Sequence, residues 1–176
     1  MIELKVKKVG LQELVLSLNN FGNDINLLTE PLNDSARYMQ QQAIMNFPAS
    51  GALMQSSGWQ GLADSTKDVK EGRISFRTIK GRKIPMKPIA GDAYPGAPIM
   101  VRTGTLKNSF MITNPRIGKD YGEIEVFNPI EYAIYHQKGG VRLPQRILLR
   151  FQKQQIQDIT NIFTRWIDKI TNRNFK

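Results

Sequence analysis

The chain contains no cysteine and only one histidine, His136. The absence of cysteine excludes disulfide bonds, thiolate zinc sites and thiol nucleophiles together. Histidine is the most frequent general acid or base, so a single histidine makes acid–base catalysis poorly supported. A metal site would need its ligands from scattered carboxylates. The sequence also lacks an uninterrupted hydrophobic run of bilayer length, which excludes a transmembrane helix.

Several other signatures of catalysis and ligand binding are missing. The glycines at positions 91 and 96 enclose a proline and no lysine, unlike a phosphate-binding loop. Ser109 has no base or acid at a spacing typical of a nucleophile, and no group of acidic residues has metal-ligand spacing. No recognition helix, zinc finger or base-stacking sheet motif is present. We therefore expect no catalytic residue, no cofactor and no metal.

Length and composition are those of a small soluble protein. A chain of 176 residues suits a single domain with its own core and is short for two. Hydrophobic residues make up 40% and charged residues 23% of the chain, as in ordinary globular proteins. The first eight residues lack the long apolar core of a secretory signal, so we expect synthesis in the cytoplasm.

The net charge of +10 is concentrated in two segments. Residues 66–90 contain eight basic and two acidic residues, residues 141–176 contain the same numbers, and residues 1–40 contain four and five. A positive surface attracts polyanions through counterion release without reading a base sequence. The charge alone favours two interpretations equally: a surface close to DNA, or a solvated surface that meets acidic protein partners.

The hydrophobic pattern predicts an α+β domain, in which a small antiparallel β-sheet is packed by two helices. One helix is expected over Asp24–Phe47, where apolar residues recur at three- and four-residue steps. Pro31 requires either a kink or a fresh helix start with the proline in its first turn. A long C-terminal helix is expected to begin at Ile147–Leu149 and to continue through Ile170.

Strands are predicted at four places, one of which is residues 73–79 in the basic segment, where Ile74, Phe76 and Thr78 alternate. Residues 2–9 alternate with a period of two, and residues 110–113 and 122–127 flank a turn, which predicts a hairpin. Residues 131–138 predict a short helix that ends at Gly139-Gly140, because glycine tolerates a left-handed exit. The segment 66–100 is predicted to be an extended basic loop or hairpin within the single domain.

Four short motifs follow one another along the chain. The first is Phe47 followed by Gly58-Trp59-Gln60-Gly61-Leu62 and Thr66, and the second is Arg102-Thr103-Gly104-Thr105-Leu106-Lys107-Asn108-Ser109. The third is Tyr132-Ala133-Ile134-Tyr135-His136-Gln137-Lys138-Gly139-Gly140, and the fourth is Pro144-Gln145-Arg146-Ile147-Leu148. In this order and spacing, the motifs resemble the tail-completion and virion-morphogenesis family of tailed phages, the Mu protein G-like group. The likeness to neck proteins of long-tailed phages is more distant.

The resemblance implies a structural protein that is not an enzyme. Proteins of this family assemble at the junction of head and tail, commonly as a ring. We therefore expect a hexameric ring of this chain in the virion, after synthesis in the host cytoplasm. The expected partners are other copies of the chain, neighbouring neck, connector, tail-terminator and tail-tube proteins, and the passing genomic DNA without sequence specificity. No membrane partner is expected.

The motif residues have two interpretations. They form either a subunit interface, in which tyrosines anchor the contact, or a local folding motif, which the Gly-Gly pair and the tyrosines favour. His136 is expected to be a hydrogen-bonded structural residue. The candidate residues are Trp59, Thr103, Gly104, Leu106, Ser109, Tyr132, Tyr135, His136, Gly139, Gly140, Pro144 and Arg146.

Seven basic residues are candidates to face DNA, with a solvated surface as the alternative. They are Lys80, Arg82, Lys83, Lys87, Arg142, Arg150 and Lys153. Two other functions stay open: a sequence-independent DNA-binding accessory protein, and a capsid-assembly factor of the same family.

Overall fold

The computed structural model describes residues 28–70, 75–86, 98–118, 121–141 and 143–175, together with residues 16, 19–20 and 22–23. Its helices and antiparallel strand pairs form an α+β fold, as predicted. The strand predicted at residues 2–9 and the helix start predicted at Asp24 lie outside the described residues. None of the helices in the described part of the chain is long and apolar enough to cross a membrane.

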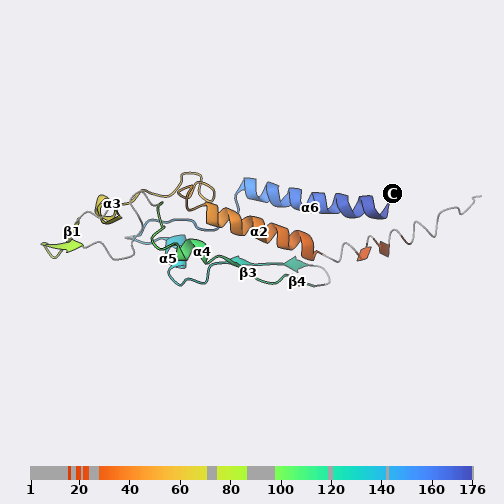
Figure 1. The fold of residues 1–176 in the computed structure, drawn as a ribbon, viewed down its shortest axis with the longest axis horizontal. Helices are drawn as coiled ribbons and strands as arrows, with labels where there is room; N and C mark the ends of the chain where they lie inside the picture. Colours follow the sequence, from red (N-terminus) through yellow and green to blue (C-terminus); the bar gives the residue numbers. More distant parts are fainter. Residues whose placement is uncertain are drawn as a thin grey trace, which may run out of the picture.

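Three layers make up most of the molecule (Figure 1). Helix α2 (Thr29–Met45) lies between the C-terminal helix α6 (Lys153–Asn174) and a long hairpin. The sequence analysis expected both helices to pack on the sheet, whereas α6 packs mainly on α2. The reason is that the strand pairs are too short to present a surface for two helices.

The long hairpin consists of two successive antiparallel strand pairs. Strand β3 (Met111–Ile112) pairs with β6 (Val126–Phe127), and β4 (Arg116–Ile117) pairs with β5 (Gly122–Glu123). Pro115 lies between the two pairs and has no amide hydrogen to donate, which is consistent with the interruption. The hairpin predicted over residues 110–127 is therefore present, but the turn predicted at residues 115–121 is wrong in its first part, because Arg116 and Ile117 form β4.

Helix α2 begins with Pro31 in its first turn, which is the second of the two predicted solutions. Its buried stripe runs through Leu32, Ala36, Met39 and Ala43, so the periodicity of the sequence identified the packed face correctly. The helix ends at Met45, and the chain then makes a series of turns.

Helices α2 and α6 are joined along one side by polar contacts. The Tyr38 hydroxyl donates a hydrogen bond to the Asp158 carboxylate, and the Lys169 ammonium lies 2.6 Å from the Glu30 carboxylate. Burial raises the pKa of Tyr38 to about 12, and the hydrogen bond and negative charge of Asp158 act in the same direction. Trp166 and Ile170 are the buried apolar residues of α6.

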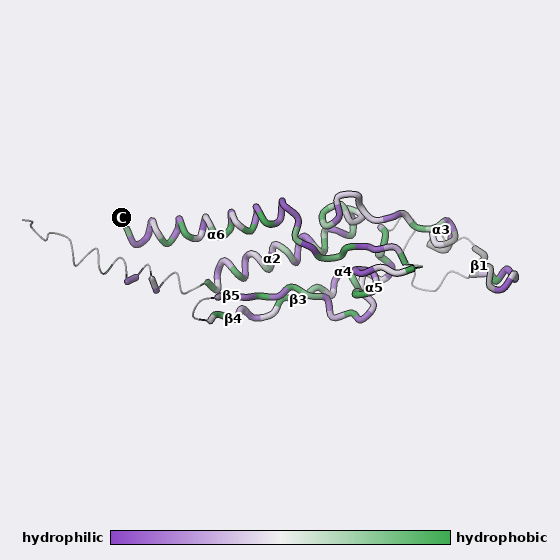
Figure 2. Tube along the Cα trace, turned by 180° about the vertical axis from the view of Figure 1, so that it is seen from behind, coloured by the Kyte–Doolittle hydropathy of each residue, from purple (hydrophilic) through white to green (hydrophobic). Residues whose placement is uncertain are grey.

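The basic segment contains a helix and a hairpin. Helix α3 (Asp64–Lys70), which the sequence analysis did not predict, precedes strands β1 (Ser75–Ile79) and β2 (Arg82–Met86). Lys80 and Gly81 connect the strands with positive φ angles of 47° and 78°, as a two-residue type I′ turn requires. This basic hairpin, residues 75–86, lies far from the C-terminus (Figure 1), and its tip is hydrophilic (Figure 2).

The main core lies where α2 ends. The rings of Phe47 and Trp59 meet edge to face with centroids 5.3 Å apart, and the Phe110 ring lies 6.3 Å from Phe47. Around these rings pack residues from α4 (Thr105–Asn108), from α5 (Ala133–Lys138) and from the extended segment before α6. Edge-to-face pairs add to the burial of apolar area, so this cluster stabilises the region that joins all four motifs.

Candidate functional site

The extended segment of residues 145–149 crosses the core and is held by side-chain amides. The Ile147 carbonyl accepts hydrogen bonds from Asn46 Nδ2 at 3.0 Å and from Trp59 Nε1 at 3.1 Å, and the Ile147 amide donates to Gln55 Oε1 at 3.4 Å. Asn46 is fully buried, and its Oδ1 accepts a bond from the Met54 amide at 3.2 Å. A buried backbone group without a strand partner needs such contacts.

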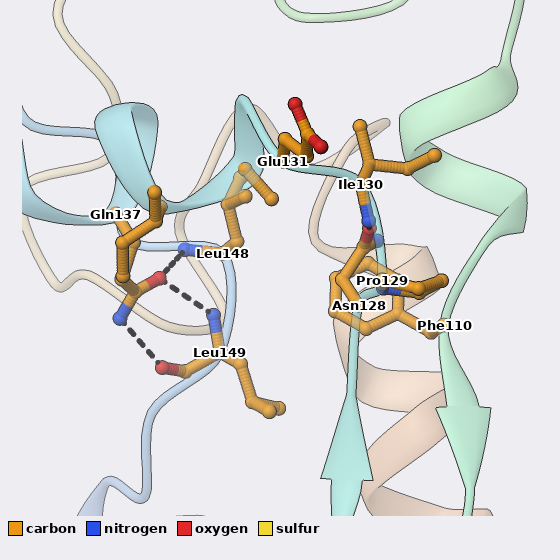
Figure 3. Close-up of a pocket in the computed structure, with 10 residues that line it drawn as sticks. Phe110, Asn128, Pro129, Ile130, Glu131, Gln137, Leu148 and Leu149 are labelled. Carbon is orange, nitrogen blue, oxygen red and sulfur yellow. Dashed lines mark hydrogen bonds between the residues drawn. The ribbon is translucent and has the colours of Figure 1, made fainter.

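Gln137 holds the other side of the same segment (Figure 3). Its Oε1 accepts bonds from the amides of Leu148 at 2.7 Å and Leu149 at 3.2 Å, and its Nε2 donates to the Leu149 carbonyl at 2.9 Å. We call this arrangement the amide junction, made by Asn46, Gln55, Trp59, Gln137 and residues 145–149. The predicted C-terminal helix is present as α6, but its predicted start at Ile147–Leu149 is wrong, because these backbone groups bond to side chains and α6 begins only at Lys153.

Trp59 can reach the junction because Gly51 has no side chain. Gly51 has a φ of +90°, and a Cβ atom there would lie 2.2 Å from Trp59 Cδ1. The indole therefore lies directly on the Gly51 backbone. The same kind of close approach occurs at Gly139, where a Cβ atom would lie 2.8 Å from the Gln145 amide nitrogen.

The turn after α5 brings the third and fourth motifs together. Gly139 has a φ of +70°, and the Gly140 amide donates to the Leu143 carbonyl at 2.7 Å. The Arg146 amide then donates to the His136 carbonyl at 2.8 Å. This geometry is a tight chain reversal of the kind that the folding interpretation predicts, and Gly139 is the glycine that it requires.

A pocket of about 570 Å³ lies between α4 and α5 and gathers residues from all four motifs. We call it the arginine pocket. Its walls include apolar side chains from the 62–66 and 100–106 stretches. Three basic residues also line it, Arg102, His136 and Arg146. None of the described residues that line it is a carboxylate. The full set is Leu62, Thr66, Met100, Val101, Arg102, Thr103, Gly104, Thr105, Leu106, Tyr132, His136 and Arg146.

Arg146 is the most unusual residue in this pocket. Its side chain is only 6% exposed, and its buried Nε has no hydrogen-bond partner among the described residues. His136 Nδ1 is buried in the same way, so the described part of the chain supplies no bond to this atom, contrary to our expectation. Burial lowers the pKa of His136, and the positive charge of Arg146 lowers it further.

Two threonine hydroxyls border the pocket on the α4 side. The Oγ1 atoms of Thr103 and Thr105 lie 2.7 Å apart, and Thr103 Oγ1 accepts a bond from the Thr105 amide at 3.4 Å. The Ser109 hydroxyl instead donates to the Thr105 carbonyl at 2.6 Å. Gly104 precedes the helix with a φ of +82°. The turn predicted at Thr103–Ser109 is therefore present, with Thr103 as the acceptor.

The other predicted residues are spread over the surface. Tyr132 lies in the arginine pocket with its ring edge-to-face to His136, whereas Tyr135 is exposed and does not line the pocket. Lys80, Arg82 and Lys83 are exposed at the tip of the basic hairpin, while Arg150 and Lys153 are exposed near the start of α6. The structure does not bring these two groups together (Figure 1). Lys87 and Arg142 lie outside the described residues.

A second hollow of about 490 Å³ is lined in part by Gln137, Leu148 and Leu149 (Figure 3). It is mostly apolar, and Asn128 beside it is used internally, since its Nδ2 donates to the Leu106 carbonyl at 2.8 Å. The amides of Asn128 and Gln137 are thus engaged in holding the fold. The lining residues are Phe110, Asn128, Pro129, Ile130, Glu131, Ala133, Ile134, Gln137, Leu148 and Leu149.

Sequence reasoning missed the amides of the junction. Asn46 and Gln55 carry no recognisable pattern in the sequence. Outside the junction, Gln155 on α6 makes a similar contact, since its Nε2 donates to the Leu53 carbonyl at 2.8 Å. The partners of these amides lie about a hundred positions away along the chain, as for Asn46 and Ile147, which are 101 residues apart. Gln137 stands within the third motif, but its role as a triple hydrogen-bonding residue depends on the fold.

Comparison of the chain with family models, with curated proteins and with solved structures finds no match. The described residues contain no group of three or more histidine, aspartate or glutamate side chains placed to hold a metal ion. The functional interpretation therefore depends on the surfaces and pockets of this chain itself.

Proposed function

We propose that this chain is a structural protein of a tailed-phage virion, which acts in tail completion or head–tail joining as a ring around the DNA channel. The observation that carries the proposal is a pair of exposed apolar faces on the two outer layers of the fold. A ring needs two such faces, because each subunit offers one patch to a different patch of the next.

The first of these is the hairpin face, formed by Met111 and Phe127. These residues are directly opposite each other in the β3–β6 ladder, so their side chains lie on the same side of it. They are 51% and 39% exposed. Large apolar side chains that stay in solvent next to each other are typical of surfaces that meet another protein.

The second is the α6 face, formed by Ile156 and Ile167. They are 55% and 45% exposed and stand 11 residues apart, three helical turns on the same side of α6. Helix α6 and the hairpin lie on opposite sides of α2 (Figure 1), so the two faces point to different neighbours. This supports a head-to-tail ring rather than a two-fold dimer.

The basic hairpin supports a place next to DNA. Lys80, Arg82 and Lys83 are exposed at its tip, and the described residues contain no salt bridge to them. We propose that they face the passing genome in the ring and bind it through phosphate charge alone. The same hairpin supports the second candidate, a sequence-independent DNA-binding accessory protein. A capsid-assembly factor would use the two apolar faces without the hairpin.

A mixing experiment tests the head-to-tail contact. One variant carries Ile156→Asp with Ile167→Asp, and the other carries Met111→Lys with Phe127→Glu, in which the opposed charges can pair. We expect each variant to be a folded monomer by circular dichroism and sedimentation, and the equimolar mixture to form a dimer through its one intact interface. Val141→Asp, at a fully exposed loop position, should assemble like the wild type.

The size of the wild-type assembly then separates a ring from a two-fold interface, because a two-fold contact stops at the dimer whereas a head-to-tail contact adds further subunits. A wild-type chain that stays monomeric at high concentration, or variants that assemble alone, would contradict the ring. A monomer that retards naked duplex DNA at moderate salt would favour the accessory protein instead.

A further inference from the structure

Arg146 is a buried charge without a counterion in the described part of the chain. Its side chain is 94% removed from solvent, since 6% remains exposed, and its Nε has no hydrogen-bond partner among the described residues. Leaving a charge in this state is costly, because burial removes its hydration and no carboxylate of the described residues replaces it. Buried polar groups without a partner are uncommon in native structures, and a bound ion is one of the explanations for them.

The side chain lies in the wall of the arginine pocket, where other groups suit an anion. His136 Nδ1, buried and likewise unbonded among the described residues, lines the same pocket. The adjacent hydroxyls of Thr103 and Thr105 can each turn a hydrogen towards a ligand. The described lining contains no acidic residue that would compete for the guanidinium.

We propose that the arginine pocket binds a carboxylate, with Arg146 as its main partner. A guanidinium presents its donors in a planar fork that matches the two oxygens of a carboxylate. One arginine charge neutralises one carboxylate charge, which matters here because Leu62, Met100, Val101 and Leu106 make part of the wall apolar. The depressed pKa of His136 leaves this ring neutral near pH 7, so Arg146 is the fixed charge that the anion meets.

A DNA phosphate fits this site less well. Each backbone phosphate has charged neighbours on both sides, and these would have to leave water for one phosphate to reach a guanidinium that is 6% exposed. A carboxylate at the end of a side chain, or in a free organic acid, enters alone. The exposed basic hairpin is the better surface for DNA, and the arginine pocket is therefore a separate site.

His136 gives a direct probe because it is the only histidine in the chain. Sodium acetate is titrated into the wild-type protein at constant ionic strength, with chloride as the replaced ion, while NMR follows the imidazole signals. We expect a saturable shift and a rise in the pKa of His136, since a nearby negative charge favours the imidazolium. The absence of a saturable response would overturn the proposal.

Three variants locate the response. Arg146→Gln should weaken the apparent acetate affinity by about tenfold or more, whereas Arg150→Gln, an exposed arginine outside the pocket, should leave it unchanged. In case Arg146→Gln does not fold, Thr105→Glu is expected to place a carboxylate at the pocket from an exposed position. It should raise the pKa of His136 without ligand and abolish the acetate response. An unchanged acetate response in both pocket variants would also overturn the proposal.

Inorganic phosphate and a short DNA duplex are titrated in parallel. A saturable response to either of these without a response to acetate would overturn the assignment to carboxylate. Dilution of the wild-type protein without acetate distinguishes the sources of the ligand: a carboxylate from a second copy makes the His136 signal depend on protein concentration, and a free acid does not. Both results agree with the proposal, which does not depend on the ring and is unaffected if the ring is absent.

Discussion

The amide junction and the basic hairpin are built in opposite ways. In the junction, a segment without a strand partner is held by buried side chains that are far away in the sequence, such as Asn46 and Trp59 on the Ile147 carbonyl. In the hairpin, two regular strands pair with each other around a two-residue turn, and the charged tip is exposed. Packing therefore determines the first region, and local sequence determines the second.

The largest expected difference concerns one glycine in each region. Gly51 and Gly81 have similar φ angles of 90° and 78°, but a Cβ at Gly51 would meet Trp59 at 2.2 Å while one at Gly81 would meet nothing within 4 Å. We expect Gly51→Ala to lower the free energy of unfolding by about 3 kcal/mol or more, from backbone strain and overpacking. Gly81→Ala should cost about 1 kcal/mol, from φ alone. Urea unfolding followed by circular dichroism measures both, and equal losses would contradict the contrast.

A smaller loss is expected for one amide of the junction. Gln137→Ala removes three hydrogen bonds and leaves the Leu148 and Leu149 amides unpaired, which should cost about 2–3 kcal/mol. Gln145→Ala, which removes a single exposed bond of 3.2 Å, is the control and should cost about 0.5 kcal/mol or less. If the two variants unfold at the same urea concentration, Gln137 does not hold the segment.

The contact between α2 and α6 predicts a change at alkaline pH. Because the pKa of Tyr38 is raised to about 12 in the fold from 10.0, the Tyr38–Asp158 contact contributes stability below pH 10 that is lost as the pH rises towards 12. Tyr38→Phe should cost about 1 kcal/mol at pH 7. Its stability should also fall less than that of the wild type between pH 10 and 12. A parallel fall in both proteins would exclude this contribution.

The smallest effect on stability is expected in the basic hairpin. Lys80→Gln with Arg82→Gln removes exposed charges, so the free energy of unfolding should change by no more than about 0.5 kcal/mol. The affinity for duplex DNA should fall, and its salt dependence should become shallower by about 0.9 in log–log slope for each lost phosphate contact. Lys138→Gln with Arg165→Gln removes the same charge elsewhere. Equal losses of affinity in the two variants would show that only net charge matters.

The contrast between the regions also explains what the sequence could predict. Pro31 indicated a kink or a helix start, Gly139 indicated the end of α5, and the turn predicted at 115–121 indicated the long hairpin, because each depends on local backbone chemistry. The same reasoning wrongly assigned Ile147–Leu149 to a helix, because a short apolar run is equally compatible with a buried helix and with a buried extended segment. Its true partners, Asn46, Gln55 and Trp59, are 88 to 101 residues away.

The sequence named some of the residues that line the arginine pocket, but it did not indicate the pocket itself. Trp59, Leu106, Tyr132, His136 and Arg146 were selected from the motifs, and the fold brings them to the core or to the arginine pocket. Nothing in the sequence indicated that Arg146 would be buried with its Nε unbonded among the described residues. The burial of Arg146 and the distance of acidic side chains from it both depend on the tertiary fold, which the sequence pattern does not reveal.

The proposed role depends on whether this chain builds a ring in a finished particle. Subunit-resolution imaging of the virions whose genome encodes the chain would decide it. We expect a closed ring at the head–tail junction, in which the α6 face of each subunit meets the hairpin face of the next and the basic hairpins point to the DNA channel. Mature particles that lack the chain altogether would contradict the proposal.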